Sequence, residues 1–354
     1  MNHFTVTDTQ FNIENLSSQF KVKSYDKSYS VEIVSKNLHN ILIEIYNEND
    51  YIIADEFFKS KVQHFKSVFV IATEENKTME KVLEILDILQ NNKFSKKNKL
   101  IILGGGILQD IGGLVSGLYK RGVSWVLIPT TMLAITDSCI GGKVGVNRNS
   151  KNAIGMFYSP NQVIISDYFL ETLNNDMIIS GLGESLKLAA IAGQNEVNKF
   201  KFFLQNNDKK SIILQSLSIK KAIIEVDELE RCERKVLNYG HTVGHAIESS
   251  CDYFIPHGIA VLFGMYLVNR LFERANNFKE FNDYILSLIP LKYFIQFNTI
   301  EIIKHMENDK KNIGDQICFI VLEDYGKSNF VYKSKEEVYP ILNSIIDDLN
   351  IKPI

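Results

Sequence analysis

Residues 100–118 read LIILGGGILQDIGGLVSGL, an apolar strand pattern that runs into three glycines and then into a helical pattern. A glycine turn between a strand and a helix presents backbone N–H groups at the helix N-terminus, where they can bind a phosphate. The stretch is a poor match to GxGxxG, because Gln109 stands where the third glycine belongs. A tight structural turn therefore explains Gly104, Gly105 and Gly106 about as well as a nucleotide site does.

Short apolar runs and helical patterns alternate on both sides of this stretch. Further runs predict strands at residues 51–54, 67–72 and 124–128. Such alternation indicates a mostly parallel sheet covered on both faces. Beyond about residue 170 the periodicity is mainly helical. We therefore expect a Rossmann-like α/β domain over residues 1–170 and an all-α domain over residues 171–354, with the active site in the cleft between them.

Composition excludes several classes of protein. The 354 residues carry a net charge of -3, with a pI near 6.2, which gives no electrostatic case for nucleic acid binding. No apolar run is long enough to span a bilayer, and the N-terminus lacks a signal-peptide pattern. The four cysteines have no CxxC spacing, which favours a cytoplasmic location and argues against a disulfide framework or a thiolate metal site.

Three of the seven histidines lie close together in the sequence, at positions 241, 245 and 257. Residues 238–248 read NYGHTVGHAIE, and if they are helical, His241 and His245 share one face. Imidazole is a common metal ligand, so the cluster suggests a metal site. If His241 and His245 stood alone, they could equally be an ordinary pair of histidines at the surface or in the core. The flanking glycines and the nearby His257 favour the metal site, since glycine lets a large group approach the backbone.

Cations and amides are concentrated at glycine turns and near acidic or histidine motifs. They are Arg121, Lys143, Asn147, Lys151, Asn152, Lys187, Lys220, Arg234 and the Asp309-Lys310-Lys311 triplet. If they converge, they suit a substrate with a phosphate and a carboxylate, although any single lysine is more simply solvated. Glu184 and Lys187 form either a surface ion pair or a ligand and a substrate cation. Thr130 and Thr131 end a strand and either contact a nucleotide or cap a helix.

Taken in order along the chain, these motifs resemble those of the 3-dehydroquinate synthases, members of the sugar phosphate cyclase superfamily. The resemblance covers about residues 50–325. It rests on Gly104–Gly106 with Asp110, Arg121-Gly122, Pro129–Thr131, Asp137 with Gly141–Lys143 and Asn147, Lys151-Asn152, Asp167 with Thr172-Leu173, Glu184 with Lys187, Lys220 with Asp227-Glu228, Arg234–Glu248, His257-Gly258 and Asp309–Lys311.

The resemblance implies a role for each matching residue. The metal ligands, for zinc or cobalt, would be Glu184, His241 and His257. The catalytic group would be Lys143, Lys187, Lys220, Arg234, Asn238 and His245. Substrate contacts would come from Arg121, Asp137, Asn152, Lys310 and Lys311, with Arg121 reaching the substrate phosphate in its own subunit or in the neighbouring subunit of a homodimer. NAD contacts would come from Asp55, Glu74, Lys77, Gly104, Gly105, Gly106, Asp110, Thr130, Thr131, Lys143, Lys151, Phe169 and Thr172.

The implied reaction converts 3-deoxy-D-arabino-heptulosonate 7-phosphate to 3-dehydroquinate and phosphate through transient oxidation, phosphate elimination, re-reduction, ring opening and aldol closure. Some positions depart from the family pattern, notably Met177, Cys232, Ile135 and Ser150 in a shortened loop. A cyclase acting on sedoheptulose 7-phosphate or glucose 6-phosphate is therefore an alternative. A metal- and NAD-dependent polyol dehydrogenase and a catalytically silent protein of the same fold are others. The retained cations favour the carboxylate-bearing substrate.

Overall fold

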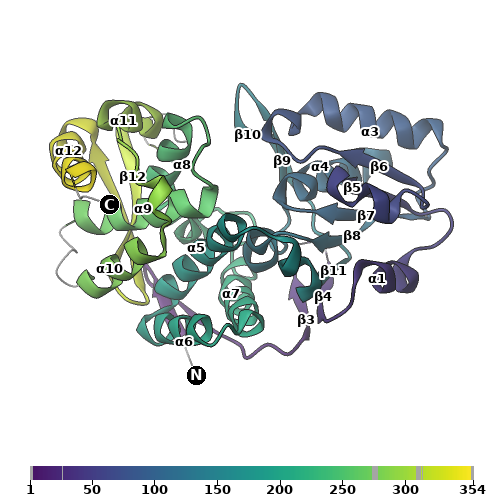
Figure 1. Cartoon of the computed structure of the whole chain (residues 1–354), viewed down its shortest axis with the longest axis horizontal. Helices are drawn as coiled ribbons and strands as arrows, with labels where there is room; N and C mark the ends of the chain where they lie inside the picture. The colour runs from purple at the N-terminus through teal and green to yellow at the C-terminus, as the bar shows by residue number, and fades with distance from the viewer. Residues whose placement is uncertain (1–2, 26, 273–277, 308–311, 313, 352–354) are drawn as a thin grey trace. The chain divides into compact units, whose positions relative to one another are not determined.

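The computed structural model of the chain describes residues 3–25, 27–272, 278–307, 312 and 314–351. They form two compact units (Figure 1). One consists of Asn15–Leu173, and the other joins Met1–Glu14 to Asn174–Ile354. The domain division expected from the sequence placed residues 1–170 together. Residues 3–14 instead belong to the second unit, because β1 (His3–Val6) pairs with β13 (Lys327–Ser334) near the C-terminus and β2 (Thr9–Asn12) pairs with β1.

The first unit is built on a seven-stranded sheet in the order β3-β4-β11-β8-β7-β5-β6. All its neighbouring pairs are parallel except β3 with β4, so the expected mostly parallel, Rossmann-like sheet is confirmed. Its strands are β3 (Gln19–Lys23), β4 (Ser28–Val34), β5 (Tyr51–Asp55), β6 (Ser67–Val70), β7 (Lys99–Gly104), β8 (Ser124–Pro129) and β11 (Gln162–Ser166).

Side chains of β7 alternate between the two faces of this sheet. Ile101 and Leu103 join a buried cluster with residues of α1, while Ile102 packs against α4, where Gly112 leaves it room. Both faces are therefore covered, as the apolar strands require. The helical elements of this unit are α1 (Leu38–Ile45), η1 (Glu56–Phe58), α2 (Lys59–Val62), η2 (Glu74–Asn76), α3 (Met79–Asn91), α4 (Gly106–Leu118), η3 (Tyr119–Arg121), the π-helical η4 (Ala134–Ser138) and η5 (Asp167–Thr172).

A hairpin of β9 (Lys143–Arg148) and β10 (Ser150–Phe157) also belongs to this unit. From the sequence, Lys143 and Asn147 are among the groups expected at glycine turns, whereas in the structure both lie on strand β9. Glycine weakens a strand pattern, but here it permits close pairing: a Cβ on Gly155 would lie 2.6 Å from the carbonyl oxygen of Val144.

The second unit is mainly helical, as expected, but it is not all-α. A four-stranded sheet in the order β12-β13-β1-β2 adjoins its helices. The strands are β1 (His3–Val6), β2 (Thr9–Asn12), β12 (Gln316–Asp324) and β13 (Lys327–Ser334). The helical elements are α5 (Asn175–Ala192), α6 (Gln194–Gln205), α7 (Lys209–Ile224), η6 (Glu233–Asn238), α8 (His241–Ser250), α9 (His257–Leu271), α10 (Lys279–Leu288), η7 (Leu291–Tyr293), α11 (Thr299–Glu307) and α12 (Lys335–Ile351). Among the described residues, none of the helices is both long and apolar enough to cross a membrane.

Candidate active site

Helices α5 and α9 cross in direct backbone contact. A Cβ on Gly258 would lie 1.8 Å from the carbonyl oxygen of Ser180, and one on Gly183 would lie 2.3 Å from the carbonyl oxygen of Gly258. Ser180 Oγ also accepts a hydrogen bond from the Gly258 N–H at 3.0 Å. This crossing brings His257, the first residue of α9, beside Glu184 in the buried middle of α5.

Helix α8 contacts α9 in the same way. A Cβ on Gly264 would lie 1.9 Å from the carbonyl oxygen of Gly240, and Gly244 lies close to the backbone of Ala260. The glycines beside His241 therefore admit a large neighbour, as the sequence predicted, and that neighbour is α9 itself. His241 and His245 lie one turn apart on α8.

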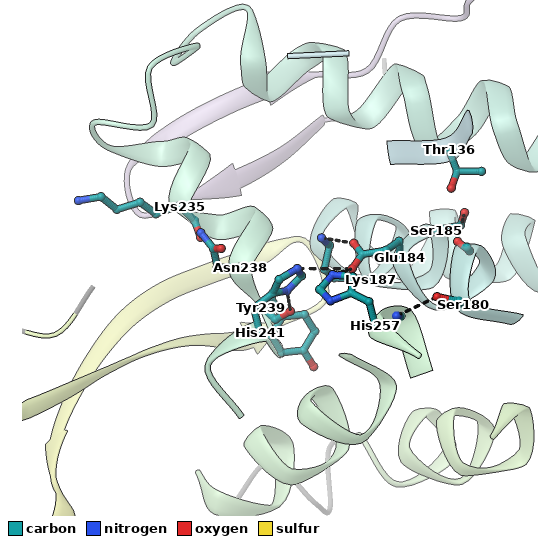
Figure 2. Close-up of polar contacts among 12 residues, drawn as sticks. Thr136, Ser180, Glu184, Ser185, Lys187, Lys235, Asn238, Tyr239, His241 and His257 are labelled. Atoms are coloured by element: carbon teal, nitrogen blue, oxygen red, sulfur yellow. Dashed lines mark hydrogen bonds and ion pairs between the residues drawn. The ribbon is translucent and has the colours of Figure 1, made fainter. Parts of the chain in front are cut away.

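Five polar side chains from these three helices converge. Glu184 Oε1 lies 3.4 Å from His241 Nε2 and 3.3 Å from His257 Nε2, and its other oxygen pairs with the Lys187 ammonium (Figure 2). His245 belongs to the same cluster, since one ligand atom from each of the three histidines lies within 4.8 Å of the others. The structure thus brings together the three predicted metal ligands and adds His245 as a fourth candidate.

The cluster strongly favours positive charge. Burial raises the pKa of the Glu184 carboxyl, but the Lys187 ammonium and His257 outweigh burial and hold that pKa well below its ordinary value. Burial lowers the pKa of His257, yet the carboxylates of Glu248 and Glu184 raise it to about 9. Carboxylates therefore face both ring nitrogens of His257, and this arrangement favours a positive charge there, which a divalent cation would supply.

In His241 and His257, the ring nitrogen that does not face Glu184 has a hydrogen-bond partner of its own. His257 Nδ1 lies 3.0 Å from Glu248 Oε2, and His241 Nδ1 lies 3.2 Å from the Tyr239 carbonyl oxygen. When Nδ1 donates to these acceptors, the lone pair of Nε2 is left for a ligand. The Tyr239 hydroxyl is itself fixed by Asn269, at 2.6 Å. The sequence reasoning gave no role to Glu248 or Tyr239, although both stand in the quoted histidine stretch.

Two of the three distances between these donors match those around a tetrahedral metal ion. Bonds of about 2.0–2.1 Å around zinc separate neighbouring ligand atoms by about 3.3–3.4 Å. The Glu184 oxygen lies 3.4 Å and 3.3 Å from the two Nε2 atoms, so one ion could bind all three. Two imidazoles and one carboxylate also suit zinc or cobalt chemically.

The predicted catalytic cations of this unit come from elements packed on α5. Lys187 lies on α5 itself, Lys220 lies on α7, and Arg234 lies on η6; all three are buried, and both α7 and η6 contact α5. The Asn238 amide donates to Glu230 Oε1 at 3.0 Å. Lys310 and Lys311 lie outside the described residues, as does Asp309.

In the first unit, the predicted cofactor contacts gather at the carboxyl ends of the parallel strands, where open α/β sheets bind ligands. Strand β5 ends at Asp55, β7 ends at Gly104, and β8 ends directly before Thr130. Asp55 also accepts from the Phe57 N–H at 3.1 Å, and burial raises its pKa. Tight packing explains two of the three glycines. A Cβ on Gly104 would meet Leu108 at 2.6 Å, and one on Gly105 would meet Thr131 at 2.7 Å.

At Gly106 an added Cβ would have open space, with Ser138 Oγ nearest at 3.9 Å. The Thr131 hydroxyl accepts from the Ala134 N–H at 3.2 Å, which is the capping contact weighed as the alternative for this threonine. Its hydroxyl hydrogen can still donate to a bound group.

A polar network joins the segment after β6 to the β9–β10 hairpin. Lys77 Nζ lies 2.5 Å from Asp110 Oδ2 and donates to Asn152 Oδ1 at 2.7 Å. The Asn147 amide donates to Glu74 Oε2 at 2.8 Å. Residues predicted to contact cofactor and substrate therefore bind one another here. Their wide spacing in the sequence gave no sign of these contacts.

The other candidates of this unit differ in exposure. Phe169 is completely buried in the core cluster, which leaves it no exposed surface for the predicted cofactor contact, and its carbonyl accepts from the Thr172 hydroxyl at 2.7 Å. Arg121 is exposed on a left-handed turn, with φ of 64°. Lys143 is exposed at the start of β9, while Lys151 on β10 and Asp137 in η4 are half-buried.

The fold identifies a class of proteins. A solved 2-deoxy-scyllo-inosose synthase, in complex with carbaglucose-6-phosphate, NAD⁺ and Co²⁺, matches 92% of this chain and 99% of its own, with a TM-score of 0.79 and 21% identity. At that identity the likeness concerns the fold alone, in which a unit built on a mostly parallel sheet is joined to a mainly helical unit.

Sequence comparison is more specific. Models for the N-terminal and C-terminal parts of 3-dehydroquinate synthase match residues 67–180 and 181–312. The 3-dehydroquinate synthase of Pelagibacter ubique (strain HTCC1062) is 36% identical over 91% of this chain and 89% of its own length. That of Clostridium tetani (strain Massachusetts / E88) is 34% identical over 86% and 87%. The chain belongs to the 3-dehydroquinate synthase family.

Proposed function

We propose that this protein converts 3-deoxy-D-arabino-heptulosonate 7-phosphate to 3-dehydroquinate and phosphate, as a carbon–oxygen lyase that uses NAD and a divalent metal, zinc or cobalt. The observation that carries the proposal is the cluster of Glu184, His241 and His257, whose donor atoms have the spacing of a metal site, in a chain of this family. When bound, the metal supplies Lewis-acid polarisation of a substrate oxygen, and NAD supplies a hydride acceptor.

The chain's own residues then bind and orient the substrate. The buried cations Lys187, Lys220 and Arg234 can neutralise a phosphate and a carboxylate in a site of low dielectric. His245 lies within the histidine cluster, where its imidazole can hold or move a proton. The glycine turn before α4 offers N–H groups to the pyrophosphate of the dinucleotide.

The proposal includes a homodimer in which the exposed Arg121 contributes to the partner subunit's site. Light scattering on the purified protein measures the assembly. Mixing the Arg121→Ala and His257→Ala chains then tests the shared site. If Arg121 serves its neighbour, a mixed dimer contains one site that has lost neither residue, so mixing restores activity that neither variant has alone.

Phosphate release tests the reaction. The purified protein, with NAD⁺ and zinc, is offered the heptulosonate phosphate, sedoheptulose 7-phosphate and glucose 6-phosphate in parallel. We expect phosphate from the first alone and no net NADH. Release only from another sugar would make the protein a related cyclase. Stoichiometric NADH from a polyol would make it a dehydrogenase, and no turnover at all would contradict an enzymatic role.

A further inference from the structure

The N-terminal hairpin, formed by β1 and β2 (residues 3–12), is an integral part of the unit that carries the histidine cluster. Strand β1 pairs in parallel with β13, and the Thr5 N–H donates to the Gly326 carbonyl oxygen at 2.8 Å. Phe4, Val6 and Phe11 are buried, and β1 contacts α5. These residues are therefore integrated into the domain and are not an appended tail.

A first tether runs from this hairpin to the segment that holds Arg234. The Thr9 hydroxyl donates to Glu233 Oε1 at 2.8 Å, and Glu233 directly precedes Arg234 at the start of η6. The segment before η6 is irregular, so side chains hold it in place. The Asp227 carboxylate accepts three of its backbone N–H groups, including that of Arg234 at 3.1 Å. Thr9 holds the same segment in place through its hydrogen bond to Glu233, the residue directly before Arg234.

A second tether runs to the helix that holds Lys220. The Glu14 backbone carbonyl accepts from the Ser218 hydroxyl, and the Glu14 carboxylate lies 2.9 Å from Lys221 Nζ. Lys221 also pairs with Glu225 at 2.9 Å. Ser218 and Lys221 lie on either side of Lys220 along α7, and all three are buried. The residues that follow the hairpin therefore hold α7 at the turn that carries Lys220.

We propose that Thr9 and Glu14 are positioning residues that set the places of Arg234 and Lys220 for binding the charged groups of the substrate. The proposal rests on the proposed function, which makes those two cations substrate contacts. The Glu14 side chain is 63% exposed, and the buried Lys221 keeps its ion pair with Glu225 when the Glu14 charge is removed, so the change costs little stability. Small displacements of a binding group are costly for substrate affinity. Loss of the tethers should therefore affect the KM for substrate more than it affects stability.

Steady-state kinetics of Thr9→Val, Glu14→Gln and the double variant test this role. Valine keeps the shape of threonine without the hydroxyl, and glutamine keeps the shape of glutamate without the charge. We expect the double variant to raise KM for the heptulosonate phosphate by about threefold to tenfold, with kcat within about twofold of the unaltered protein. The melting temperature should stay close to that of Thr5→Val, a matched control on the neighbouring strand.

A double-mutant cycle separates positioning from general damage. If Thr9 acts through Arg234, the effect of Thr9→Val on KM should shrink in an Arg234→Lys background. An unchanged KM in the double variant, or an effect of full size in that background, would overturn the inference while the unaltered enzyme still released phosphate. If the unaltered protein released no phosphate from this substrate, the proposed function would fail and the inference with it.

Discussion

At the scale of single residues, His257 contacts two carboxylates through different ring nitrogens. Its Nε2 lies 3.3 Å from Glu184 Oε1, and its Nδ1 lies 3.0 Å from Glu248 Oε2. An Nδ1–H that donates to Glu248 holds the ring in the tautomer whose Nε2 lone pair can bind a metal. Glu248 therefore acts on the metal site without itself being one of the predicted ligands.

Replacing Glu248 with glutamine tests this relation. The change keeps the size of the side chain but removes the charge that orients His257, so we expect zinc affinity to fall by about 10- to 100-fold. Competition with a fluorescent chelator measures the affinity directly, without the need for turnover. Glu301→Gln on α11, where the carboxylate is 44% exposed and pairs with Lys304, is the control. Equal zinc affinity in both variants would mean that Glu248 does not support the site.

At the scale of elements, the metal cluster depends on how closely α5, α8 and α9 approach. Gly183 and Gly258 allow one pair of helices to touch, and Gly240 and Gly264 allow the other. At Gly183, Gly258 and Gly264 the nearest atoms are backbone, which cannot move aside as a flexible side chain can, so glycine is required there.

Gly258→Ala should therefore disrupt both packing and the site. The new Cβ would lie 1.8 Å from the Ser180 carbonyl oxygen, so α9 must shift. We expect a loss of about 3 kcal/mol or more in the free energy of unfolding, at the upper end for overpacked positions, together with weaker zinc binding. Urea unfolding in the presence of a chelator measures the loss of stability without any contribution from zinc binding. Gly106→Ala, where an added Cβ has open space, should cost little stability; a similar loss in both variants would contradict the packing explanation.

At the scale of the whole molecule, the predicted metal and NAD contacts lie in different compact units. The histidine cluster belongs to the unit that contains Asn174–Ile354, and the glycine turn belongs to Asn15–Leu173. A ligand stabilises the structure that binds it, by about 2.7 kcal/mol at 100 times its dissociation constant. The two ligands should therefore protect different parts of the chain from hydrogen exchange.

Hydrogen exchange followed by mass spectrometry checks this expectation. Zinc should slow exchange in peptides of α5, α8 and α9, and NAD⁺ should slow it in peptides that span the end of β7 and the start of α4. Magnesium at the same concentration is the control for zinc, because it prefers oxygen ligands. Zinc protection confined to the β7–α4 peptides would show that the metal does not bind at the histidine cluster.

Local patterns in the sequence determined much of this fold. Short apolar runs bounded by turns marked β5, β6, β7 and β8, because buried parallel strands need apolar side chains on both faces. The spacing of His241 and His245 placed both on one side of α8, since helical geometry depends only on neighbouring residues. The ordered motifs also predicted the family, which the comparisons confirmed.

Pairings between distant residues were decided only by the tertiary structure. The strand character of β1 and β2 depends on pairing with β13 at the other end of the chain, so no local pattern marked it. The glycines of α8 and α9 allow these two helices to touch, and no local pattern marked that contact. The ion pair of Lys77 with Asp110 likewise joins residues that are far apart in the sequence. A sequence lists the groups that can bind a metal or a phosphate, but the distances between those groups, and therefore their chemistry, arise when separate elements pack together.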